Sequence, residues 1–292
     1  MKEFEYLKPE SFDQLQNLIT RYENAGIKFF AGGTDLIVQL KQNANFNFKY
    51  LIDLEKLNLN YIKYDNNYLK IGALTTLSNI ESNTFLKENF PVFTNTTSKM
   101  ASVQIRNKAT IGGNLCNAAP SADLAPPLLV LDAKLKILSK EKEKVVSIEE
   151  FFLGPGRTIL SSSEILKEII LDIPRGEWTA VYIKSMRTSE DIATVGVAVK
   201  LSKDKDKNKY NDIKIALGAV APTPIRVYKA EMFFLENYCK QDKQSVVEKT
   251  AEITANECKP IDDVRASADF RKIIVKKYIS RSILLALQKL SD

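Results

Sequence analysis

Two double-glycine segments combine residue types that could hold a phosphorylated ligand. The first, residues 31–36 (AGGTDL), lies between two apolar runs and predicts a strand, a tight turn and a helix. The second, residues 110–114 (TIGGN), predicts another double-glycine turn and precedes a switch from polar to apolar residues. Glycine lets backbone amides approach a pyrophosphate without an intervening Cβ, and a helix N-terminus adds unpaired donors and a favourable dipole. Together, the segments suggest one bound phosphorylated cofactor.

Each segment also has an explanation that involves no ligand. A double-glycine turn followed by a helix cap, here Thr34 or Asp35, occurs at many strand-to-helix junctions. Neither segment is a Walker A loop, because no Gly-Lys-Ser or Gly-Lys-Thr follows, and neither matches the G-x-G-x-x-G pattern of a Rossmann dinucleotide site. The occurrence of two similar segments in one chain favours a shared ligand over two coincidences.

The chain contains no histidine, which removes Ser-His and Cys-His catalytic pairs, imidazole metal sites and the commonest general base near neutral pH. Its three cysteines, Cys116, Cys239 and Cys258, are far apart and lack C-x-x-C spacing. This pattern argues against a disulfide framework, a zinc site or an iron–sulfur cluster in this chain. We therefore expect no catalytic side chain and no metal site. A cofactor with its own reactivity, such as a flavin or a nicotinamide, would supply the chemistry.

Charge and hydropathy narrow the range of partners. The formal net charge is +6, but the lysines alternate with acids, as in residues 140–144 and 203–207. A nucleic-acid surface needs clustered basic residues, so we expect no nucleic-acid partner. No apolar run is long enough for a membrane span, and the first residues lack the pattern of a signal peptide. The expectation is a cytoplasmic protein.

The elements that would position the two segments fall into three tracts of an α+β protein. Residues 1–60 predict strand, helix, strand, helix, strand, a small βαβ-type unit whose first helix begins with the capping pair Ser11 and Gln14. Residues 61–175 alternate strands with helices, and residues 176–292 predict a three-stranded antiparallel sheet followed by helices. With 45% hydrophobic residues, the 292-residue chain can form more than one core.

Several boundaries can be predicted within these tracts. The expected helices are 76–83, 89–100 and 267–290. The expected strands of the last tract are 180–186, 192–201 and 212–220, with a charged loop at 203–211. Residues 135–138 and 145–148 should pair as a hairpin, because the charged segment between them suits a turn.

The sequence resembles one known family over essentially its whole length. The segments that carry the resemblance are 29–36 (FFAGGTDL), 104–107 (QIRN), 110–114 (TIGGN), 120–123 (PSAD), 191–195 (DIATV), 217–224 (LGAVAPTP) and 263–265 (DVR). In these motifs the chain is similar to the FAD-binding medium subunits, or domains, of the molybdenum hydroxylases. This is the family of xanthine dehydrogenase, aldehyde oxidoreductase and carbon monoxide dehydrogenase.

The resemblance implies a FAD-binding fold of the vanillyl-alcohol-oxidase type, also called PCMH-type. FAD-binding subdomain 1 (1–60) and FAD-binding subdomain 2 (61–175), both α/β, would enclose the cofactor, and a C-terminal domain (176–292) would follow. Backbone amides of residues 30–36 and 110–114 would hold the pyrophosphate and adjoining groups. Asp123 would bind a polar part of FAD, Leu166 and Lys184 would lie near the flavin, and Ile192 would lie against its ring. The implied cofactor-binding residues are Phe29, Phe30, Ala31, Gly32, Gly33, Thr34, Asp35, Leu36, Thr110, Ile111, Gly112, Gly113, Asn114, Asp123, Leu166, Lys184 and Ile192.

Ordinary structural roles stay open for the single residues. Asp123 could cap a helix that begins near residue 124, instead of binding a cofactor or in addition to it. Without the resemblance, Lys184 would be a solvated charge on a strand, and Leu166 and Ile192 would be core residues. Cys116 has no visible partner for redox or nucleophilic chemistry, so we expect an inert thiol.

The resemblance implies an electron-transfer subunit of a multi-subunit oxidoreductase. FAD would take electrons from iron–sulfur clusters and pass them to NAD⁺ or another acceptor. Molybdopterin and the 2Fe-2S clusters are expected on partners only, namely an iron–sulfur small subunit and a molybdenum-cofactor large subunit, in a dimer of heterotrimers. Two other functions stay open: a self-sufficient FAD-dependent oxidoreductase of the same broad fold, and a flavin-free assembly module.

Overall fold

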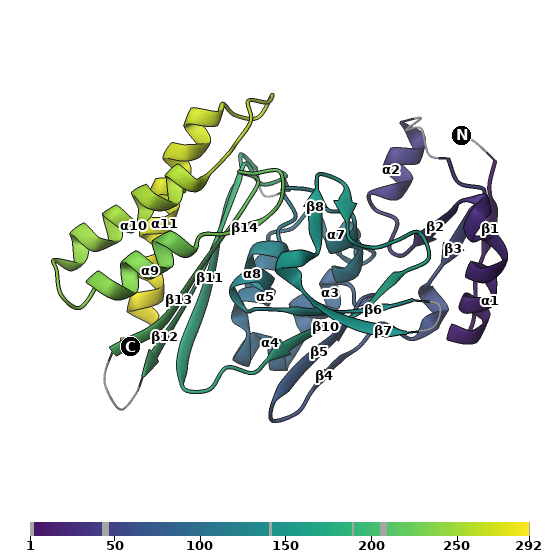
Figure 1. Cartoon of the computed structure of the whole chain (residues 1–292), viewed down its shortest axis with the longest axis horizontal. Coiled ribbons are helices and arrows are strands. Elements are labelled where there is room, and N and C mark those ends of the chain that lie inside the picture. Colours follow the sequence, from purple (N-terminus) through teal and green to yellow (C-terminus); the bar gives the residue numbers. More distant parts are fainter. Residues whose placement is uncertain (1–2, 43–46, 140–141, 189, 205–208, 292) are drawn as a thin grey trace.

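Three main β-sheets follow one another along the longest axis of the molecule (Figure 1). The structure is a computed structural model that describes residues 3–42, 47–139, 142–188, 190–204 and 209–291. The N-terminal sheet lies at one end, the sheet of the middle tract lies in the centre, and the C-terminal sheet with its long helices lies at the other end. The predicted α+β fold class is confirmed.

The N-terminal region is a three-stranded parallel sheet with strand order β1-β3-β2. Its elements are β1 (Glu5–Leu7), α1 (Phe12–Tyr22), β2 (Ile27–Phe30), α2 (Leu36–Lys41) and β3 (Tyr50–Asp53), in the predicted order. Ser11 caps α1 by accepting a hydrogen bond from the Gln14 amide, as the capping pattern predicts. The Gln14 side chain accepts from the amide of Glu10 and not from that of Ser11, so the reciprocal bond is shifted by one residue.

The middle region is built on a five-stranded antiparallel sheet with strand order β4-β5-β10-β6-β7. Its strands are β4 (Ile62–Tyr64), β5 (Tyr68–Gly72), β6 (Lys134–Leu138), β7 (Glu143–Ser147) and β10 (Ile165–Asp172), and a small separate pair is formed by β8 (Phe152–Gly154) and β9 (Arg157–Thr158). The predicted hairpin is the pair β6 and β7. Its turn residues 140 and 141 lie outside the described residues.

Six short helices cover the middle sheet region. They are α3 (Leu77–Ser82), α4 (Thr84–Asn89), α5 (Pro91–Thr97), α6 (Val103–Arg106), α7 (Ile111–Cys116) and α8 (Ala125–Val130). The helix predicted over 76–83 is α3, whereas the one predicted over 89–100 is shortened to α5. Phe90 separates α4 from α5 with φ −136° and ψ 56°, because a proline disfavours helical backbone in the residue before it.

The second glycine segment differs from its prediction. Gly112 and Gly113 lie in the first turn of α7 and not in a tight turn. Thr110 is the N-cap, and its side chain accepts a hydrogen bond from the Gly113 amide at 3.0 Å. A Cβ at Gly112 would lie 2.6 Å from the carbonyl oxygen of Ala73. Close packing against the end of β5 therefore requires this glycine, and no turn is needed to explain it.

The C-terminal region has an antiparallel sheet with order β11-β12-β13-β14, so the prediction of three strands is wrong by one. Its elements are β11 (Glu177–Ser185), β12 (Val195–Asp204), β13 (Lys209–Gly218), β14 (Ile225–Arg226), α9 (Tyr228–Asn237), α10 (Lys243–Glu257) and α11 (Ala268–Lys289). Strand β14 was missed because two residues carry no alternation. Much of the predicted loop 203–211 belongs to β12 and β13, and residues 205–208 lie outside the described part of the chain.

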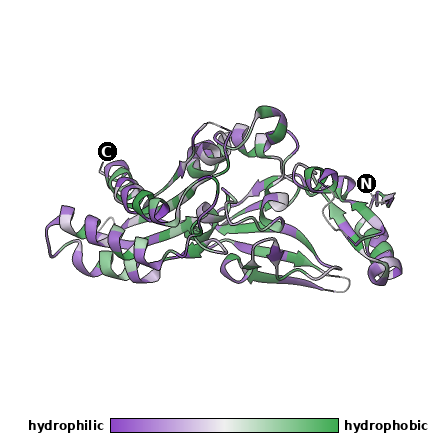
Figure 2. Cartoon of the chain, turned by 90° about the horizontal axis from the view of Figure 1, so that it is seen from above, coloured by the Kyte–Doolittle hydropathy of each residue, from purple (hydrophilic) through white to green (hydrophobic). Residues whose placement is uncertain are grey.

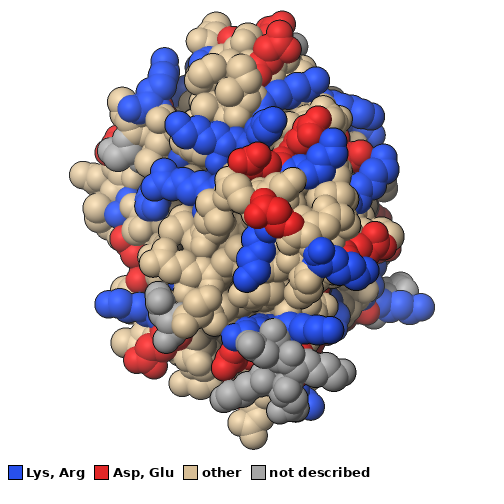
Figure 3. Space-filling view, turned by 90° about the vertical axis from the view of Figure 1, so that its left-hand side faces the viewer, with Lys and Arg blue, Asp and Glu red and all other residues tan. Residues whose placement is uncertain are grey.

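Each sheet packs on its own cluster of buried apolar side chains, represented by Ile52, Ile169 and Val197. Apolar residues are concentrated on the strands, whereas the helices near the C-terminus carry both apolar and polar residues (Figure 2). On the face formed by the C-terminal region, basic side chains are scattered and acidic side chains lie among them (Figure 3). Among the described residues, no helix has the length and apolar character needed to cross a membrane.

Candidate functional site

A cavity of about 700 Å³ is lined by residues from all three regions. Its walls come from the β2–α2 loop, α7, the segment before α8, β10 and the β11–β12 connection. The predicted residues that line it are Phe29, Phe30, Ala31, Gly32, Gly33, Thr34, Asp35, Leu36, Thr110, Gly112, Gly113, Asn114, Asp123, Leu166, Lys184 and Ile192. Ile111 is the exception, because its side chain is fully buried in the core of the middle region.

The first glycine segment presents a row of backbone amides without protein acceptors. Among the described residues, no protein acceptor is hydrogen-bonded to the amides of residues 32–36. Gly33 has a φ of +72°, which residues with a Cβ rarely adopt. Asp35 occupies the N-cap position of α2 but makes no side-chain capping bond. The ligand-free alternative, a turn followed by a helix that Thr34 or Asp35 caps, is therefore not realised in the described residues.

Gly32 lets the first segment pack against the chain just before the second. A Cβ added at Gly32 would overlap the carbonyl oxygen of Lys108 and would lie 3.1 Å from the Cα of Ala109. These two residues immediately precede Thr110, the N-cap of α7. The missing side chain thus brings both glycine segments to one cavity.

The second glycine segment has no such row of free amides. Four of its five amides donate to the protein. Ile111 donates to the Thr75 carbonyl (3.0 Å), Gly112 to the Ala73 carbonyl (2.8 Å), Gly113 to Thr110 Oγ1 (3.0 Å) and Asn114 to the Thr110 carbonyl (2.9 Å). The expectation was that the amides of residues 110–114 hold the pyrophosphate and adjoining groups, but four of these amides, those of residues 111–114, already donate to protein acceptors. The physical reason is that the segment is helical and its first residues are fastened to the end of β5.

Helix α7 contributes a side chain and open space to the cavity. Oδ1 of Asn114 is buried, and no hydrogen-bond partner for it is found among the described residues. A buried polar atom without a partner costs about 1–3 kcal/mol, so this oxygen indicates a polar ligand in the cavity that Asn114 lines. A Cβ at Gly113 would meet only Thr110 Oγ1, at 2.9 Å, within 4 Å. The space beside Gly113 is therefore open.

Asp123 is held between two donors from β11. The Tyr182 hydroxyl donates to its Oδ1 at 2.7 Å, and the Lys184 ammonium donates to its Oδ2 at 2.9 Å. All three side chains are buried. Because Tyr182 and Lys184 are two residues apart on one strand, they project from the same face of the sheet. The Lys184 ammonium also donates to the Lys99 carbonyl at 3.4 Å.

This arrangement decides two of the open alternatives. Asp123 does not cap α8, whose N-cap position is Leu124 without a side-chain capping bond. Lys184 is not a solvated charge, since it is only 8% exposed although β11 is an edge strand. Burial raises the pKa of Asp123, and the charge of Lys184 opposes the rise. Burial and the neighbouring carboxylate also raise the pKa of Tyr182 well above its usual value, so its hydroxyl stays a donor.

The two apolar residues of the predicted site differ in burial. Leu166 is 4% exposed and lies at an irregularity in the pairing of β10 with β6. Ile192 is 59% exposed and lies in the β11–β12 connection, not in a strand as predicted. The Asp191 carboxylate holds this connection by accepting a hydrogen bond from Nε of Arg187 at 3.0 Å. An exposed isoleucine on a cavity wall is not a core residue, and it suits contact with a ligand.

Several polar residues of the site were missed in the sequence. Tyr182 supports Asp123, and its two-residue spacing from Lys184 on a predicted strand is a signal that could have found it. Gln39 of α2 donates to the side chain of Asn117, the C-cap of α7, at 3.3 Å and so connects these two helices. Other polar lining residues are Arg157, Thr158, Ser161, Ser162 and Glu164. No sequence pattern marks these five, because only the tertiary fold brings their irregular segment to the cavity.

Cys116 lies on the cavity wall at the end of α7. Burial raises the pKa of its thiol to about 12, and the charge of Lys28 opposes this only in part. A reactive cysteine needs a lowered pKa, because the thiolate is the nucleophile. The prediction of an inert thiol agrees with this environment.

Two family matches, which together cover most of the chain, place it in a class of protein, the FAD-binding subunits of oxidoreductases. Residues 2–175 match the family described as the FAD binding domain in molybdopterin dehydrogenase, and residues 180–286 match the CO dehydrogenase flavoprotein C-terminal domain. The chain is 33% identical over 276 residues to the xanthine dehydrogenase FAD-binding subunit of Escherichia coli O157:H7, with 92% of each chain covered. It is 31% identical to the glyceraldehyde dehydrogenase medium chain of Sulfolobus acidocaldarius, with 94% of this chain and 95% of the relative covered.

A solved structure agrees with these relatives. The carbon monoxide dehydrogenase from Hydrogenophaga pseudoflava that lacks the Mo-pyranopterin moiety of its molybdenum cofactor matches with a TM-score of 0.92 and 26% identity, covering 99% of both chains. The chain therefore belongs to the family of FAD-binding medium subunits of molybdenum hydroxylases. It is an oxidoreductase subunit of the kind that acts within a complex. The family and the fold class implied by the sequence motifs are both confirmed.

Proposed function

We propose that the cavity holds one FAD across the two glycine segments, and that the chain transfers electrons from iron–sulfur clusters of a partner to an acceptor. The observation that carries this proposal is the row of amides of residues 32–36, which have no protein acceptor and line the same cavity as the buried Asn114 oxygen. A row of backbone donors at the start of a helix suits a pyrophosphate. A cavity of about 700 Å³ is in the range that protein ligand sites occupy.

Each part of the wall has its own task in this proposal. The amides of residues 32–36 bind the pyrophosphate, Gly113 leaves room for the cofactor, and Asn114 Oδ1 accepts a hydrogen bond from it. Asp123 has lone pairs beyond those used by Tyr182 and Lys184, so it can accept a further bond. FAD, when bound, supplies the redox chemistry by taking up electrons and passing them on.

We propose the same division of the chain that the sequence predicts. Residues 1–60 and 61–175 enclose the cofactor, and residues 176–292 supply Lys184 and Ile192 from β11 and the connection after it. Each of the three main sheets falls within one of these tracts, which supports the division. Lys184 contributes a buried positive charge to the wall, and Ile192 limits access to the cofactor from solvent.

The proposed partners would carry the metal cofactors for which this chain lacks ligands. Three dispersed cysteines without histidine do not provide the ligands of a 2Fe-2S cluster. We therefore propose an iron–sulfur small subunit and a large subunit with the molybdenum cofactor, in a dimer of heterotrimers. The name "medium chain" of the relative from Sulfolobus acidocaldarius supports this composition. The proposed acceptor is NAD⁺, and the proposed location is the cytoplasm.

The first experiment is an absorbance spectrum of the purified full-length chain before and after addition of FAD, with the released cofactor identified by mass. The expected result is a flavin spectrum and release of FAD. If the chain takes up no flavin even with its partner subunits present, the proposal fails and a flavin-free assembly module replaces it. Oxidation of a substrate by the chain alone would instead indicate a self-sufficient oxidoreductase.

Hydrogen exchange can assign the binding segment. The amides of residues 32–36 should exchange rapidly without FAD and slowly with it, because the cofactor becomes their acceptor. The amides of residues 111–114 should be protected in both states, because they already donate to protein acceptors. Equal exchange of residues 32–36 with and without FAD would place the pyrophosphate elsewhere.

The acceptor can be tested separately from cofactor binding. When NADH is added to the FAD-loaded chain without oxygen, the flavin absorbance should bleach, since the nicotinamide and the flavin can exchange a hydride in both directions. Bleaching by dithionite but not by NADH would exclude NAD⁺ as the acceptor and leave FAD binding intact.

A further inference from the structure

An ion pair between a buried arginine and a half-buried aspartate lies near the cavity but outside the site described so far. Arg271 on α11 is 2% exposed, and its Nη2 lies 2.7 Å from Oδ1 of Asp263. The Asp263 carboxylate also accepts hydrogen bonds from the Arg265 side chain and from the amides of Arg265 and Ala266. The bond from Arg265, together with these amides and Arg271, holds the pKa of Asp263 well below its usual range. Asp263 therefore stays charged beside the buried guanidinium.

The other terminal nitrogen of this guanidinium, Nη1, donates to two backbone carbonyls, at 2.8 Å to Thr194 and at 2.9 Å to Ala219. Thr194 ends the β11–β12 connection, two residues after Ile192, and its amide donates to the Ser185 carbonyl at 2.9 Å. Ala219 follows β13, and its amide donates to the Pro120 carbonyl at 2.7 Å. One nitrogen therefore joins two segments that run to different parts of the cavity wall.

The second segment reaches the wall through Pro120. Residues 119 and 121–123 line the cavity, and this stretch ends at Asp123, which binds Lys184. Ala219 itself has a φ of +64°, a conformation that is unfavourable for a residue with a Cβ. Such a residue persists only when its surroundings hold it, and here hydrogen bonds fix it on both its amide and its carbonyl side.

We propose that Arg271 is a positioning residue for the cofactor pocket. Its guanidinium fixes the backbone that carries Ile192 and the backbone that leads to Asp123 in one relative arrangement. A planar guanidinium offers donors in a fixed fork, whereas a lysine ammonium is a flexible point charge that does not reproduce this geometry. The segment 263–265 (DVR), a motif with no contact to the cavity, then serves to compensate the buried charge of Arg271. This inference rests on the proposed FAD site.

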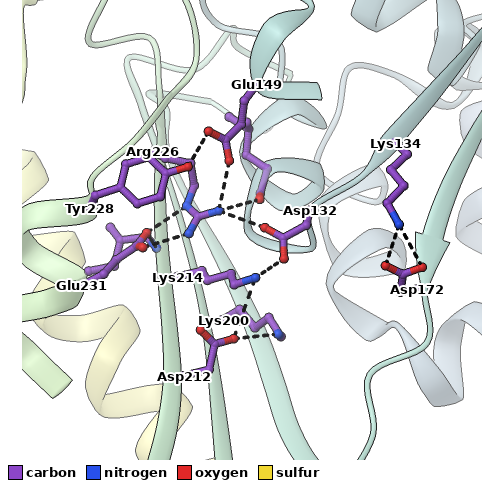
Figure 4. A network of polar contacts seen from close by, with 12 residues as sticks. Asp132, Lys134, Glu149, Asp172, Lys200, Asp212, Lys214, Arg226, Tyr228 and Glu231 are labelled. Carbon is purple, nitrogen blue, oxygen red and sulfur yellow. Dashed lines mark hydrogen bonds and ion pairs between the residues drawn. The ribbon is translucent and has the colours of Figure 1, made fainter. Parts of the chain in front are cut away.

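Arg226 provides a matched control (Figure 4). Its side chain is 4% exposed, and it also joins the C-terminal region to the middle region, through Asp132 at 3.1 Å and the Leu129 carbonyl at 3.3 Å. It pairs with Glu231 at 2.8 Å. None of these partners is among the lining residues of the cavity. Arg226→Lys should therefore perturb a buried arginine of similar kind without moving the wall.

The main experiment compares Arg271→Lys with Arg226→Lys in the full-length chain. The first readout is FAD affinity by fluorescence titration, at a temperature where circular dichroism shows both variants folded. We expect Arg271→Lys to weaken FAD binding on the order of tenfold and Arg226→Lys by less than about twofold, since coupling between distant groups has this size. The second readout needs no FAD, and it is the rate of trypsin cleavage after Arg187, whose side chain is 70% exposed in the β11–β12 connection. This rate should rise in Arg271→Lys only.

Asp263→Asn is a second variant for the case that Arg271→Lys does not fold. It leaves the guanidinium in place and removes the compensating charge, so FAD affinity and trypsin resistance should change in the same direction but less. Equal losses of FAD affinity in the two arginine variants, with unchanged cleavage after Arg187, would overturn the inference. If the unmodified chain takes up no FAD, the proposed function fails, and the trypsin comparison still decides whether Arg271 holds the connection.

Discussion

The β2–α2 loop and the start of α7 line the same cavity, but their backbone amides are used in opposite ways. In residues 32–36 the amides have no protein acceptor among the described residues, and in residues 111–114 every amide donates to the protein. The amides of the first segment can therefore donate to an anion. The second segment is held by its own hydrogen bonds, and it offers the cavity the Asn114 side chain and the space beside Gly113. Two segments of similar composition therefore line the cavity in different ways.

The glycines explain this difference. Gly32 and Gly112 allow close packing, because a Cβ at either position would press on the carbonyl oxygen of Lys108 or Ala73. Gly33 provides a positive φ, whereas Gly113 has a helical backbone and leaves the space beside it open. A glycine pair thus indicates that a Cβ is not tolerated, but it does not indicate whether a ligand or the protein itself occupies the space.

The largest expected effect is a difference in alkylation rate between Cys116, at the end of α7, and the exposed Cys239. With a pKa of about 12, roughly one thiol in 10⁴ is ionised at pH 8, and the fraction should rise about tenfold for each pH unit up to that value. Alkylation by iodoacetamide at pH 8, followed by peptide mass spectrometry, should label the exposed Cys239 and spare Cys116. Rapid labelling of Cys116 at pH 8 would contradict the raised pKa of its thiol.

Gly32→Ala should cause the next largest effect. The added methyl group would overlap the Lys108 carbonyl, and overpacking of this kind costs about 3 kcal/mol of unfolding free energy. Urea unfolding followed by circular dichroism measures the change. Gly113→Ala is the matched control and should cost at most about 1 kcal/mol, because alanine favours the helix and the only close atom, Thr110 Oγ1 at 2.9 Å, is a capping acceptor whose loss costs about that much.

Gly113→Leu should separate ligand binding from folding. Its side chain would enter the open space beside α7, so FAD affinity should fall about tenfold, a change of about 1.4 kcal/mol, with little loss of stability. Fluorescence titration with FAD measures the affinity, and urea unfolding provides the control. Unchanged affinity would show that the cofactor does not pass beside Gly113.

The smallest expected effect is the difference in unfolding free energy between variants at the N-caps of α7 and α2. Thr110→Ala removes the acceptor of the Gly113 amide and should cost about 1 kcal/mol. Asp35→Ala removes no capping bond from α2 and should change the unfolding free energy by less than about 0.5 kcal/mol. If urea unfolding shows equal losses of stability for the two variants, the N-cap bond of α7 and the missing N-cap bond of α2 do not differ in energy as we expect.

Local patterns predicted the positions of most elements. The apolar run that ends at Phe30 formed β2, the Ser11 cap began α1, and Ser267 began the last helix. These outcomes follow from interactions within a few residues of the chain. The helical state of Gly112 was not predictable in this way, because it depends on the contact with Ala73, 39 positions earlier in the chain.

At the site, too, the sequence indicated single residues but not the contacts between residues that are distant in the chain. The motifs indicated Asp123 and Lys184, but the bond between them joins the segment before α8 to β11, and Tyr182 completes the cluster from that same strand. Strand β14 has only two residues and forms because β13 is its neighbour. Arg271 had no signal at all, since its role depends on two carbonyls that belong to separate connections.

The sequence by itself determined the glycines, the order of the principal strands and helices, the absence of histidine and the motifs of the family, because these are properties of composition and of short-range periodicity. Only the tertiary structure decided which amides stay free for a ligand. A backbone amide is satisfied by whichever acceptor the fold brings to it, and no residue type encodes that acceptor. One glycine pair therefore lies in a loop after β2 whose amides have no protein acceptor among the described residues, and the other lies in the first turn of α7, where the amides donate to the protein.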